Sequence, residues 1–122
     1  TRGASESLAF GQALLARGRS LVWFPEGMRS TDGALLPFRP GIGFILATQS
    51  CPVVPVAISG TFEAWPVSRK FPSLLPRSGR VRVVFGRPHG VAELEAMGSG
   101  ATRAERIASG LREAVRRLRA AG

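Results

Sequence analysis

The amino-acid sequence predicts an α/β fold in which a partly parallel sheet is flanked by helices. Apolar runs of strand length stand at 21–24, 53–58 and 81–85, and stretches with helical spacing lie before, between and after them. The run at 53–58 is continuously apolar, as in interior strands of parallel sheets, which are covered on both faces. The order strand, helix, strand then predicts parallel pairing of the first two strands through a right-handed crossover.

Residues typical of helix ends predict two helices near these runs. A helix is predicted over 5–17, because Ser5 is a good N-cap and Gly18 is a common C-terminal glycine. A short helix over 40–50 is favoured by the proline at its start. We expect residues 1–122 to lie in one domain, since this length is typical of a single domain.

A long amphipathic helix is predicted over 102–120. Thr102 and Glu105 have the spacing of a capping box at its start. Its apolar stripe consists of Ile107, Leu111, Val115 and Leu118. Its basic face consists of Arg103, Arg106, Arg112, Arg116, Arg117 and Arg119. We interpret this face as a solvated surface on a helix packed against the core, and contact with acidic phospholipid headgroups is the alternative.

The charge of the chain is strongly positive, with 17 basic and 8 acidic residues and a formal net charge of +9. Lys70 is the sole lysine, and arginine favours phosphate-bearing partners such as anionic lipid, coenzyme A or nucleic acid, although a GC-rich genome also explains this usage. Nucleic acid is disfavoured, because the aromatic residues cluster near prolines and form no stacking platform. The single cysteine, Cys51, forms no internal disulfide and is expected in the core. No apolar run approaches the roughly twenty residues of a membrane span.

The segment Phe24-Pro25-Glu26-Gly27-Met28-Arg29-Ser30 carries the chemistry that the sequence makes most visible. It follows the first predicted strand, so Glu26 and Arg29 are expected to leave the sheet edge together. Three residues apart, the two side chains can hold each other and still leave guanidinium donors for a planar anion such as phosphate. A salt-bridged turn without a ligand is the alternative.

This segment resembles the Phe-Pro-Glu-Gly-Thr-Arg-Ser block of the PlsC-type glycerophospholipid acyltransferases, the 1-acylglycerol-3-phosphate O-acyltransferase family, and only Met28 departs from it. Phe38-Arg39-Pro40-Gly41 is similar to the Phe-Lys-x-Gly element that follows in the family. Residues 52–58 resemble the next block, an apolar strand that carries prolines. Residues 81–88 resemble the closing strand with its Gly-x-Pro end. The four elements stand in the family's order and cover most of the chain.

The resemblance implies a partial glycerolipid acyltransferase fold and an O-acyltransferase activity. The acyl group would pass from an acyl thioester, acyl-CoA or acyl carrier protein (acyl-ACP), to the free hydroxyl of a lysophospholipid such as 1-acylglycerol-3-phosphate. The thioester is a co-substrate, and no cofactor is expected. The protein would make peripheral contact with an anionic membrane on its cytoplasmic side. The alternative is a non-catalytic module that binds anionic lipid or acyl carrier protein.

The resemblance also implies roles for individual residues. Arg29 would hold the phosphate of the acceptor, Glu26 would orient Arg29 or a glycerol hydroxyl, and Gly27 would let the backbone approach the substrate. Met28 replaces a threonine hydroxyl and thereby affects acceptor specificity. The further substrate-binding candidates are Arg2 and Arg39 for the phosphate and Pro55 for the wall of the site.

No catalytic residue is assigned, because the family's His-x-x-x-x-Asp block, whose histidine is thought to act as general base, does not occur in these residues. The only histidine is His89, which follows the last predicted strand and has no aspartate after it. We expect that His89 is not the base. The chain is therefore expected to be the carboxy-terminal portion of a larger domain and to be inactive by itself.

The irregular segment 61–76 is unusually apolar for a loop. Its large apolar residues are Phe62, Trp65, Phe71, Leu74 and Leu75. These residues either form a lip that dips into the bilayer surface or guides an acyl chain, or they cap the edge of the sheet. The sequence leaves both interpretations open.

Overall fold

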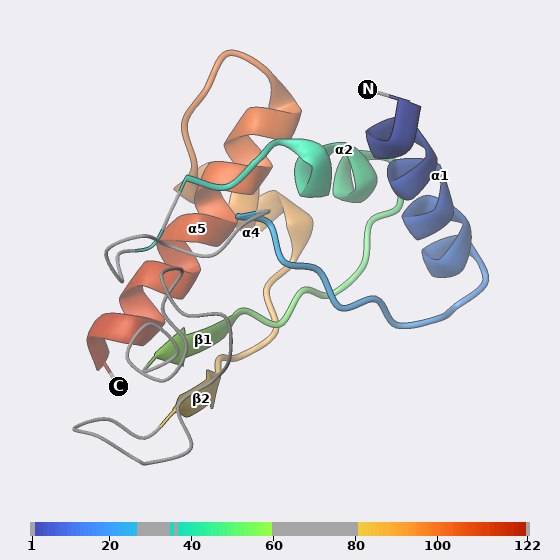
Figure 1. The fold of residues 1–122 in the computed structure, drawn as a ribbon. Coiled ribbons are helices and arrows are strands. Elements are labelled where there is room, and N and C mark those ends of the chain that lie inside the picture. Colours follow the sequence, from blue (N-terminus) through green and yellow to red (C-terminus); the bar gives the residue numbers. More distant parts are fainter. Residues whose placement is uncertain (1, 27–34, 36, 60–80, 122) are drawn as a thin grey trace.

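The computed structural model describes residues 2–26, 35, 37–59 and 81–121. The elements in chain order are α1 (Arg2–Ala16), α2 (Gly41–Thr48), β1 (Val56–Ser59), β2 (Arg82–Phe85), α4 (Val91–Met97) and α5 (Arg103–Ala121). Figure 1 shows α5 as the central element, with α2 and α4 against it and α1 beyond α2. The pair β1–β2 lies beside the carboxy-terminal half of α5.

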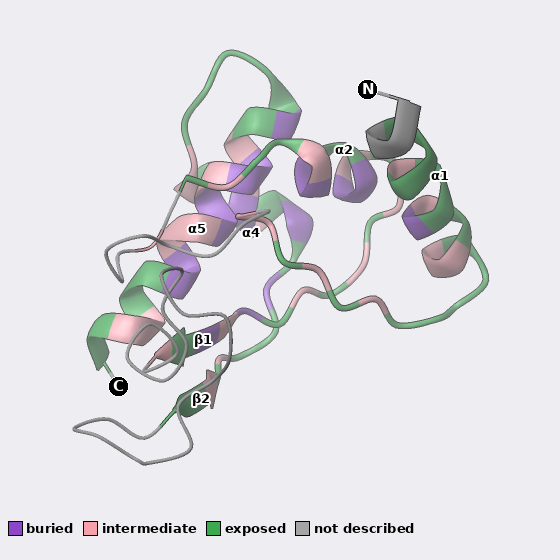
Figure 2. Ribbon diagram, viewed as in Figure 1, coloured by how far each residue is buried: buried purple, intermediate pink, exposed green. Residues whose placement is uncertain are grey.

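The core is built on the apolar stripe of α5, as the sequence predicts. Ile107, Leu111 and Val115 are buried on this helix. The amide of Glu105 donates to Thr102 Oγ1 at 3.2 Å, which confirms the predicted cap at the start of the helix. The Glu105 carboxylate accepts instead from the amide of Ala101 at 3.0 Å, so only half of the capping box is formed. Figure 2 shows the buried residues gathered where α2, α4 and α5 meet.

Two glycines allow the backbones of neighbouring helices to come close to α5. A Cβ atom on Gly43 of α2 would lie 1.9 Å from the carbonyl oxygen of Ala104. A Cβ atom on Gly110 of α5 would lie 1.7 Å from the carbonyl oxygen of Leu94 in α4. Because neither distance leaves room for a methyl group, the packing of α2 and α4 depends on these glycines.

The sheet corrects the predicted topology. Strands β1 and β2 pair antiparallel, from Val56 opposite Phe85 to Ser59 opposite Arg82. The predicted parallel pairing of 21–24 with 53–58 is therefore wrong, and in the described part of the chain 21–24 forms no strand. A strand exists only where a neighbour exchanges backbone hydrogen bonds with it, and β1 takes its partner from the later apolar run instead.

The second predicted strand is also shorter than its apolar run. Pro55 has no N–H to donate to a ladder, and β1 begins at the next residue. Before it, Val53 forms an isolated antiparallel bridge with His89. Helix α4 follows this bridge directly and is not predicted by the sequence analysis. Helices α1, α2 and α5 confirm the three predicted helices with shifts of a few residues at their ends.

One face of the β1–β2 pair packs on α5, where Ala57 is buried. Ile58, Val83 and Phe85 are exposed. Among the described helices, none has the length and apolar character that crossing a membrane requires.

Candidate functional site

The two sequence blocks on either side of residues 27–34 meet in the structure. The amide nitrogen of Arg39 donates a hydrogen bond of 2.9 Å to the carbonyl oxygen of Pro25. Pro25 and Glu26 form a turn, and Arg39 lies just before α2. This bond closes the chain between the Phe-Pro-Glu segment and the Phe-Arg-Pro-Gly segment, so their side chains share one region of the surface.

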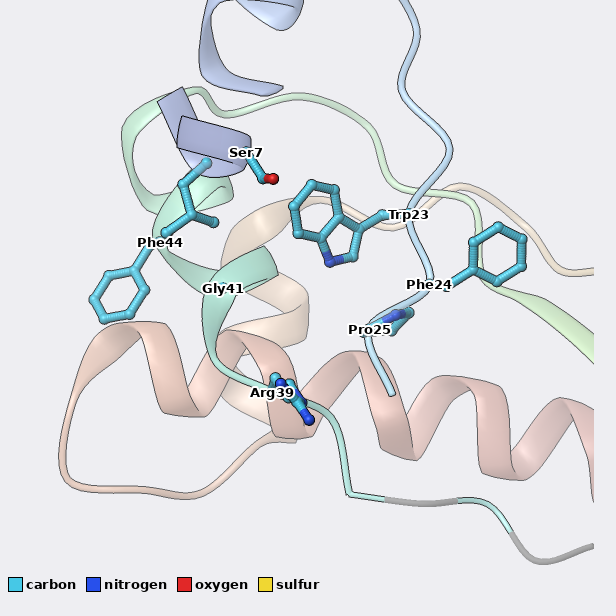
Figure 3. A pocket seen from close by; sticks show the side chains of 8 residues that line it. Ser7, Trp23, Phe24, Pro25, Arg39, Gly41 and Phe44 are labelled. Carbon is cyan, nitrogen blue, oxygen red and sulfur yellow. The ribbon is translucent and has the colours of Figure 1, made fainter. Parts of the chain in front are cut away.

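A cavity of about 300 Å³ lies where these segments face α1. It is lined by Ser7 and Leu8 of α1, by Trp23, Phe24 and Pro25, by Arg39, and by Gly41 and Phe44 of α2. The lining side chains are mostly apolar, and Arg39 is the only charged residue among them. Figure 3 shows Ser7 and Arg39 toward opposite ends of the group, with the indole of Trp23 and Gly41 between them.

The indole of Trp23 lies between α1 and α2, beside one glycine of each helix. A Cβ atom on Gly11 of α1 would lie 3.7 Å from Cζ3 of the indole. A Cβ atom on Gly41 of α2 would lie 3.8 Å from Cζ2. The half-buried indole also packs against the main core. In Figure 3 the ring of Phe24 points to the other side of the segment, as neighbouring side chains do in extended chain.

Arg39 differs from most arginines of α5 in its surroundings. Its side chain is exposed and forms no ion pair with any residue of the described ranges. Arg103 and Arg106, by contrast, both bind the carboxylate of Glu95 in α4, at 3.1 and 2.9 Å. Their hydrogen bonds lower the pKa of Glu95.

Arginines in the carboxyl-terminal part of α5 also pair with a carboxylate. Glu113 accepts hydrogen bonds from Arg116 at 2.7 Å and from Arg117 at 3.0 Å. These bonds, with the attraction of both cations, lower the pKa of Glu113 to about 2. Arg112 donates to the carbonyl oxygen of Leu35 at 2.9 Å and ties α5 to the segment that precedes Arg39. Much of the predicted basic face therefore serves contacts within the protein.

The structure describes the predicted site residues to different extents. Glu26 is half-buried at the turn, and Arg39 lines the cavity. Gly27, Met28 and Arg29 lie outside the described residues, so their roles stay predictions. Arg2 begins α1, and the structure describes its backbone only.

Pro55 lies apart from the residues that line the cavity. It is buried, and its carbonyl oxygen accepts from the amide of Gly86 at 2.9 Å. A Cβ atom on Gly86 would lie 2.9 Å from Pro55 Cγ, so the two residues are closely packed. Pro55 thus joins the end of β2 to the start of β1. Its predicted role as a wall of the substrate site stays a prediction.

His89 is 9% exposed, and its surroundings are structural. Its Nδ1–H donates to the carbonyl oxygen of Arg87 at 2.8 Å. Its backbone exchanges two hydrogen bonds with Val53, of 2.7 and 2.9 Å. The ring therefore fixes the turn between β2 and α4, and it is not among the residues that line the cavity.

Ser7, Leu8, Trp23 and Phe44 are cavity residues that the sequence analysis does not single out. A usable signal was the apolar pair Trp23-Phe24 immediately before the Pro-Glu-Gly turn, since alternation in extended chain directs the two rings apart. The apolar segment 61–76 lies outside the described residues, and both interpretations of it stay open. In the described part of the chain no group of three or more His, Cys, Asp or Glu side chains is placed to bind a metal ion.

Comparison with known proteins finds a family match for the part of the chain that carries the cavity. Residues 1–59 match the family model described as Acyltransferase. The chain is 39% identical over 75 residues to 1-acyl-sn-glycerol-3-phosphate acyltransferase BAT2, chloroplastic, of Brassica napus. These 75 residues are 62% of this chain and 21% of the relative. Together these matches support a PlsC-type acyltransferase fragment. The described residues that line the cavity all lie within residues 1–59.

Further relatives agree with this assignment. The chain is 37% identical over 78 residues to 1-acyl-sn-glycerol-3-phosphate acyltransferase LPAT1, chloroplastic, of Arabidopsis thaliana, and the match covers 63% of this chain and 21% of the relative. It is 34% identical over 58 residues to 1-acyl-sn-glycerol-3-phosphate acyltransferase beta of Homo sapiens, and the match covers 47% of this chain and 21% of the relative. The chain thus spans about a fifth of the length of these curated relatives. No solved structure matches it.

Proposed function

We propose that the protein transfers an acyl group from acyl-CoA or acyl-ACP to the free hydroxyl of a lysophospholipid such as 1-acylglycerol-3-phosphate. This chain would supply the side of the active site that binds the phosphate of the acceptor. The observation that supports the proposal is the cavity at which the two blocks meet, with Arg39 as the one charged residue among those described in its lining. The names of the relatives support the acceptor class.

The composition of the cavity fits an acceptor that is apolar over most of its length and anionic at one end. A guanidinium presents a planar set of donors that matches phosphate oxygens, and Arg39 has no carboxylate partner in the described ranges that would compete. Arg29, four residues after the hydrogen-bonded Pro25, would add a second guanidinium to the same phosphate. Glu26 would orient Arg29, and Gly27 would let the backbone approach.

The reaction needs a base that this chain does not contain. The acceptor hydroxyl attacks the thioester carbonyl, a C–O bond forms, the C–S bond breaks, and the hydroxyl proton finally reaches the departing thiolate. By the family resemblance, a histidine of a His-x-x-x-x-Asp block would carry that proton. His89 does not fit this role, because it is not among the residues that line the cavity. This chain would contribute binding and orientation, which lower the barrier by holding the hydroxyl near the thioester.

The test is a steady-state assay of the natural full-length protein that carries this chain, with acyl-CoA and acyl-ACP as donors and 1-acylglycerol-3-phosphate as acceptor. We expect ester formation, and we expect Arg29→Ala to raise the KM for the acceptor at least tenfold. Arg19→Ala is the matched control, because Arg19 is an exposed arginine that does not line the cavity. If Arg29→Ala and Arg19→Ala leave the same KM, Arg29 does not bind the phosphate. Binding of the acceptor without any ester formation would support the non-catalytic lipid-binding module instead.

A further inference from the structure

The two ends of the cavity differ in the residues that line them. Figure 3 places Arg39 toward one end of the group and Ser7 toward the other, with Gly41 and the indole of Trp23 between them. Leu8, Phe24, Pro25 and Phe44 are the other apolar residues of the lining. Among the described lining residues, one cation at one end and mostly apolar side chains elsewhere match an amphiphile that has one anionic head and one hydrocarbon chain.

We propose that this cavity binds the acceptor's own acyl chain, that the anionic head lies at Arg39, and that Gly41 keeps the passage between them open. The chain would lie along the indole of Trp23 toward Ser7. This inference rests on the proposed function, because it assigns the occupant as the acceptor. It adds a chain-binding role for Trp23 and a size-determining role for Gly41.

Gly41 is proposed to determine the size of the cavity, because a side chain at this position would extend into it. A Cβ atom there would lie 3.2 Å from Leu8 Cδ2 and 3.8 Å from Trp23 Cζ2. A methyl group would fit against the flexible end of Leu8 with a small adjustment, whereas a longer side chain would occupy the space beside the indole. Gly41 also begins α2 immediately after Pro40, so a substitution there does not interrupt a helix interior.

The apolar lining predicts how binding depends on chain length. Each methylene group that moves from water into an apolar site strengthens binding up to about fourfold. We therefore expect the affinity for 1-acylglycerol-3-phosphate to rise with every added methylene until the chain passes the end of the cavity. Beyond that length the affinity should become constant.

Fluorescence quenching reports the position of the chain directly. The sequence contains two tryptophans, Trp23 and Trp65, so Trp65→Phe leaves Trp23 as the only indole. The probe is 1-acylglycerol-3-phosphate with a bromine in the middle of its acyl chain, added below its critical micelle concentration. We expect saturable quenching of Trp23. Glycerol 3-phosphate should not quench, and the brominated monoacylglycerol without phosphate should need at least tenfold higher concentration.

Two glycine variants separate a blocked cavity from a general effect of substitution. Gly41→Leu should weaken the binding of the brominated lipid at least tenfold. Gly90→Leu is the matched control, because Gly90 also stands at the start of a helix, and a Cβ atom there would meet no atom within 4 Å. Circular dichroism checks that both variants are folded. If Gly41→Leu is not folded, Gly41→Ala replaces it, with a smaller expected loss and a shorter preferred chain.

Several results would overturn the proposal. Equal quenching by the lipid in Gly41→Leu and in the parent would remove Gly41 as the size determinant. A brominated fatty acid of the same chain that binds more tightly than the lysophospholipid would assign the cavity to a carboxylate ligand. If Trp65→Phe does not fold, calorimetry of the unmodified chain with acceptors of increasing length replaces quenching, and an affinity independent of length contradicts the proposal. None of these readouts requires turnover, so an inactive full-length protein would defeat the proposed function while leaving the chain site intact.

Discussion

The backbone amide of Arg39 donates to the carbonyl oxygen of Pro25 across 2.9 Å. The two residues are fourteen positions apart, and each belongs to a different sequence block of the PlsC type. The bond joins the two blocks near their starts, and both residues line the cavity. Arg112 reinforces this arrangement through its hydrogen bond to the carbonyl oxygen of Leu35.

The approach of α2 to α5 gives the first prediction. Gly43→Ala would place a methyl group 1.9 Å from the carbonyl oxygen of Ala104, so the helices must separate. We expect a loss of about 1–3 kcal/mol in the free energy of unfolding, even though alanine favours helix more than glycine does. Urea denaturation followed by circular dichroism measures it. Gly90→Ala, where the added methyl meets no atom within 4 Å, should change stability much less. Equal stability of the two variants would show that α2 and α5 are not in close contact.

The helices were predictable because their signals are local. The stripe of α5 repeats at helical spacing, and Thr102 marks its start. The short helix α4 was missed, although Gly90 before it, Glu93 in its first turn and Gly98 after it are the usual boundary signals. A helix of seven residues offers too little periodicity to be distinguished from a loop.

The strands could not be placed from their sequence alone, because pairing is a relation between distant segments. Residues 21–24 and 53–58 are equally apolar, yet β1 pairs with β2. The segment at 21–24 is instead held by side chains, with Trp23 between the glycines of α1 and α2. The apolar character of a segment does not identify the strand that pairs with it.

The ion-pair cluster at the end of α5 gives a prediction for pH. The pKa of Glu113 is lowered from 4.5 to about 2 by the hydrogen bonds from Arg116 and Arg117. Because the folded state holds the ionised form, the stabilisation from this carboxylate is complete above pH 4.5 and is lost as the pH falls toward 2. NMR titration of the Glu113 side chain should therefore give a midpoint near 2.

Charge-removing variants identify the cause of that shift. Arg116→Gln together with Arg117→Gln should raise the pKa of Glu113 toward its ordinary value. Arg87→Gln is the control, since Arg87 binds Glu93 and not Glu113, and it should raise only the pKa of Glu93. A midpoint near 4.5 for Glu113 in the unsubstituted chain would mean that the cluster does not form in solution.

The surroundings of His89 predict a structural phenotype. His89→Ala removes the hydrogen bond to the carbonyl oxygen of Arg87 and a mostly buried ring, so we expect a loss of about 1–3 kcal/mol in stability. The kcat of the folded full-length protein should change less than twofold. Loss of a general base would instead lower kcat by about 10²- to 10⁴-fold. A decrease of that size with intact folding would assign catalysis to His89.

The isolated 122-residue chain should not catalyse acyl transfer. It contains no His-x-x-x-x-Asp block, and its one histidine is engaged beside β2. Release of coenzyme A from acyl-CoA in the presence of 1-acylglycerol-3-phosphate is the measurement, and we expect the rate of the buffer blank. The natural full-length protein, assayed in parallel, is the positive control. Turnover by the isolated chain above the blank would mean that another group removes the proton.

The sequence singled out only some of the residues that the structure places at the cavity. The resemblance pointed to Arg39, which lines the cavity, to Glu26, which follows the lining residue Pro25, and to Pro55, which is not among the lining residues. Ser7 and Phe44 have no chemical signature, since a serine on a helix and an apolar helix residue are common everywhere. Their part in the cavity follows only from how α1 and α2 pack around Trp23.

The most direct measurement is the KM of the full-length protein for acceptors with and without a phosphate, in Arg39→Ala and in Arg19→Ala. We expect Arg39→Ala to raise the KM for 1-acylglycerol-3-phosphate about tenfold or more, with little effect on the KM for 1-acylglycerol, because a charge-assisted contact to phosphate is lost. Arg19→Ala should leave both values unchanged. An Arg39→Ala protein whose KM for the phosphorylated acceptor equals that of the parent would contradict the assignment of this cavity to the acceptor.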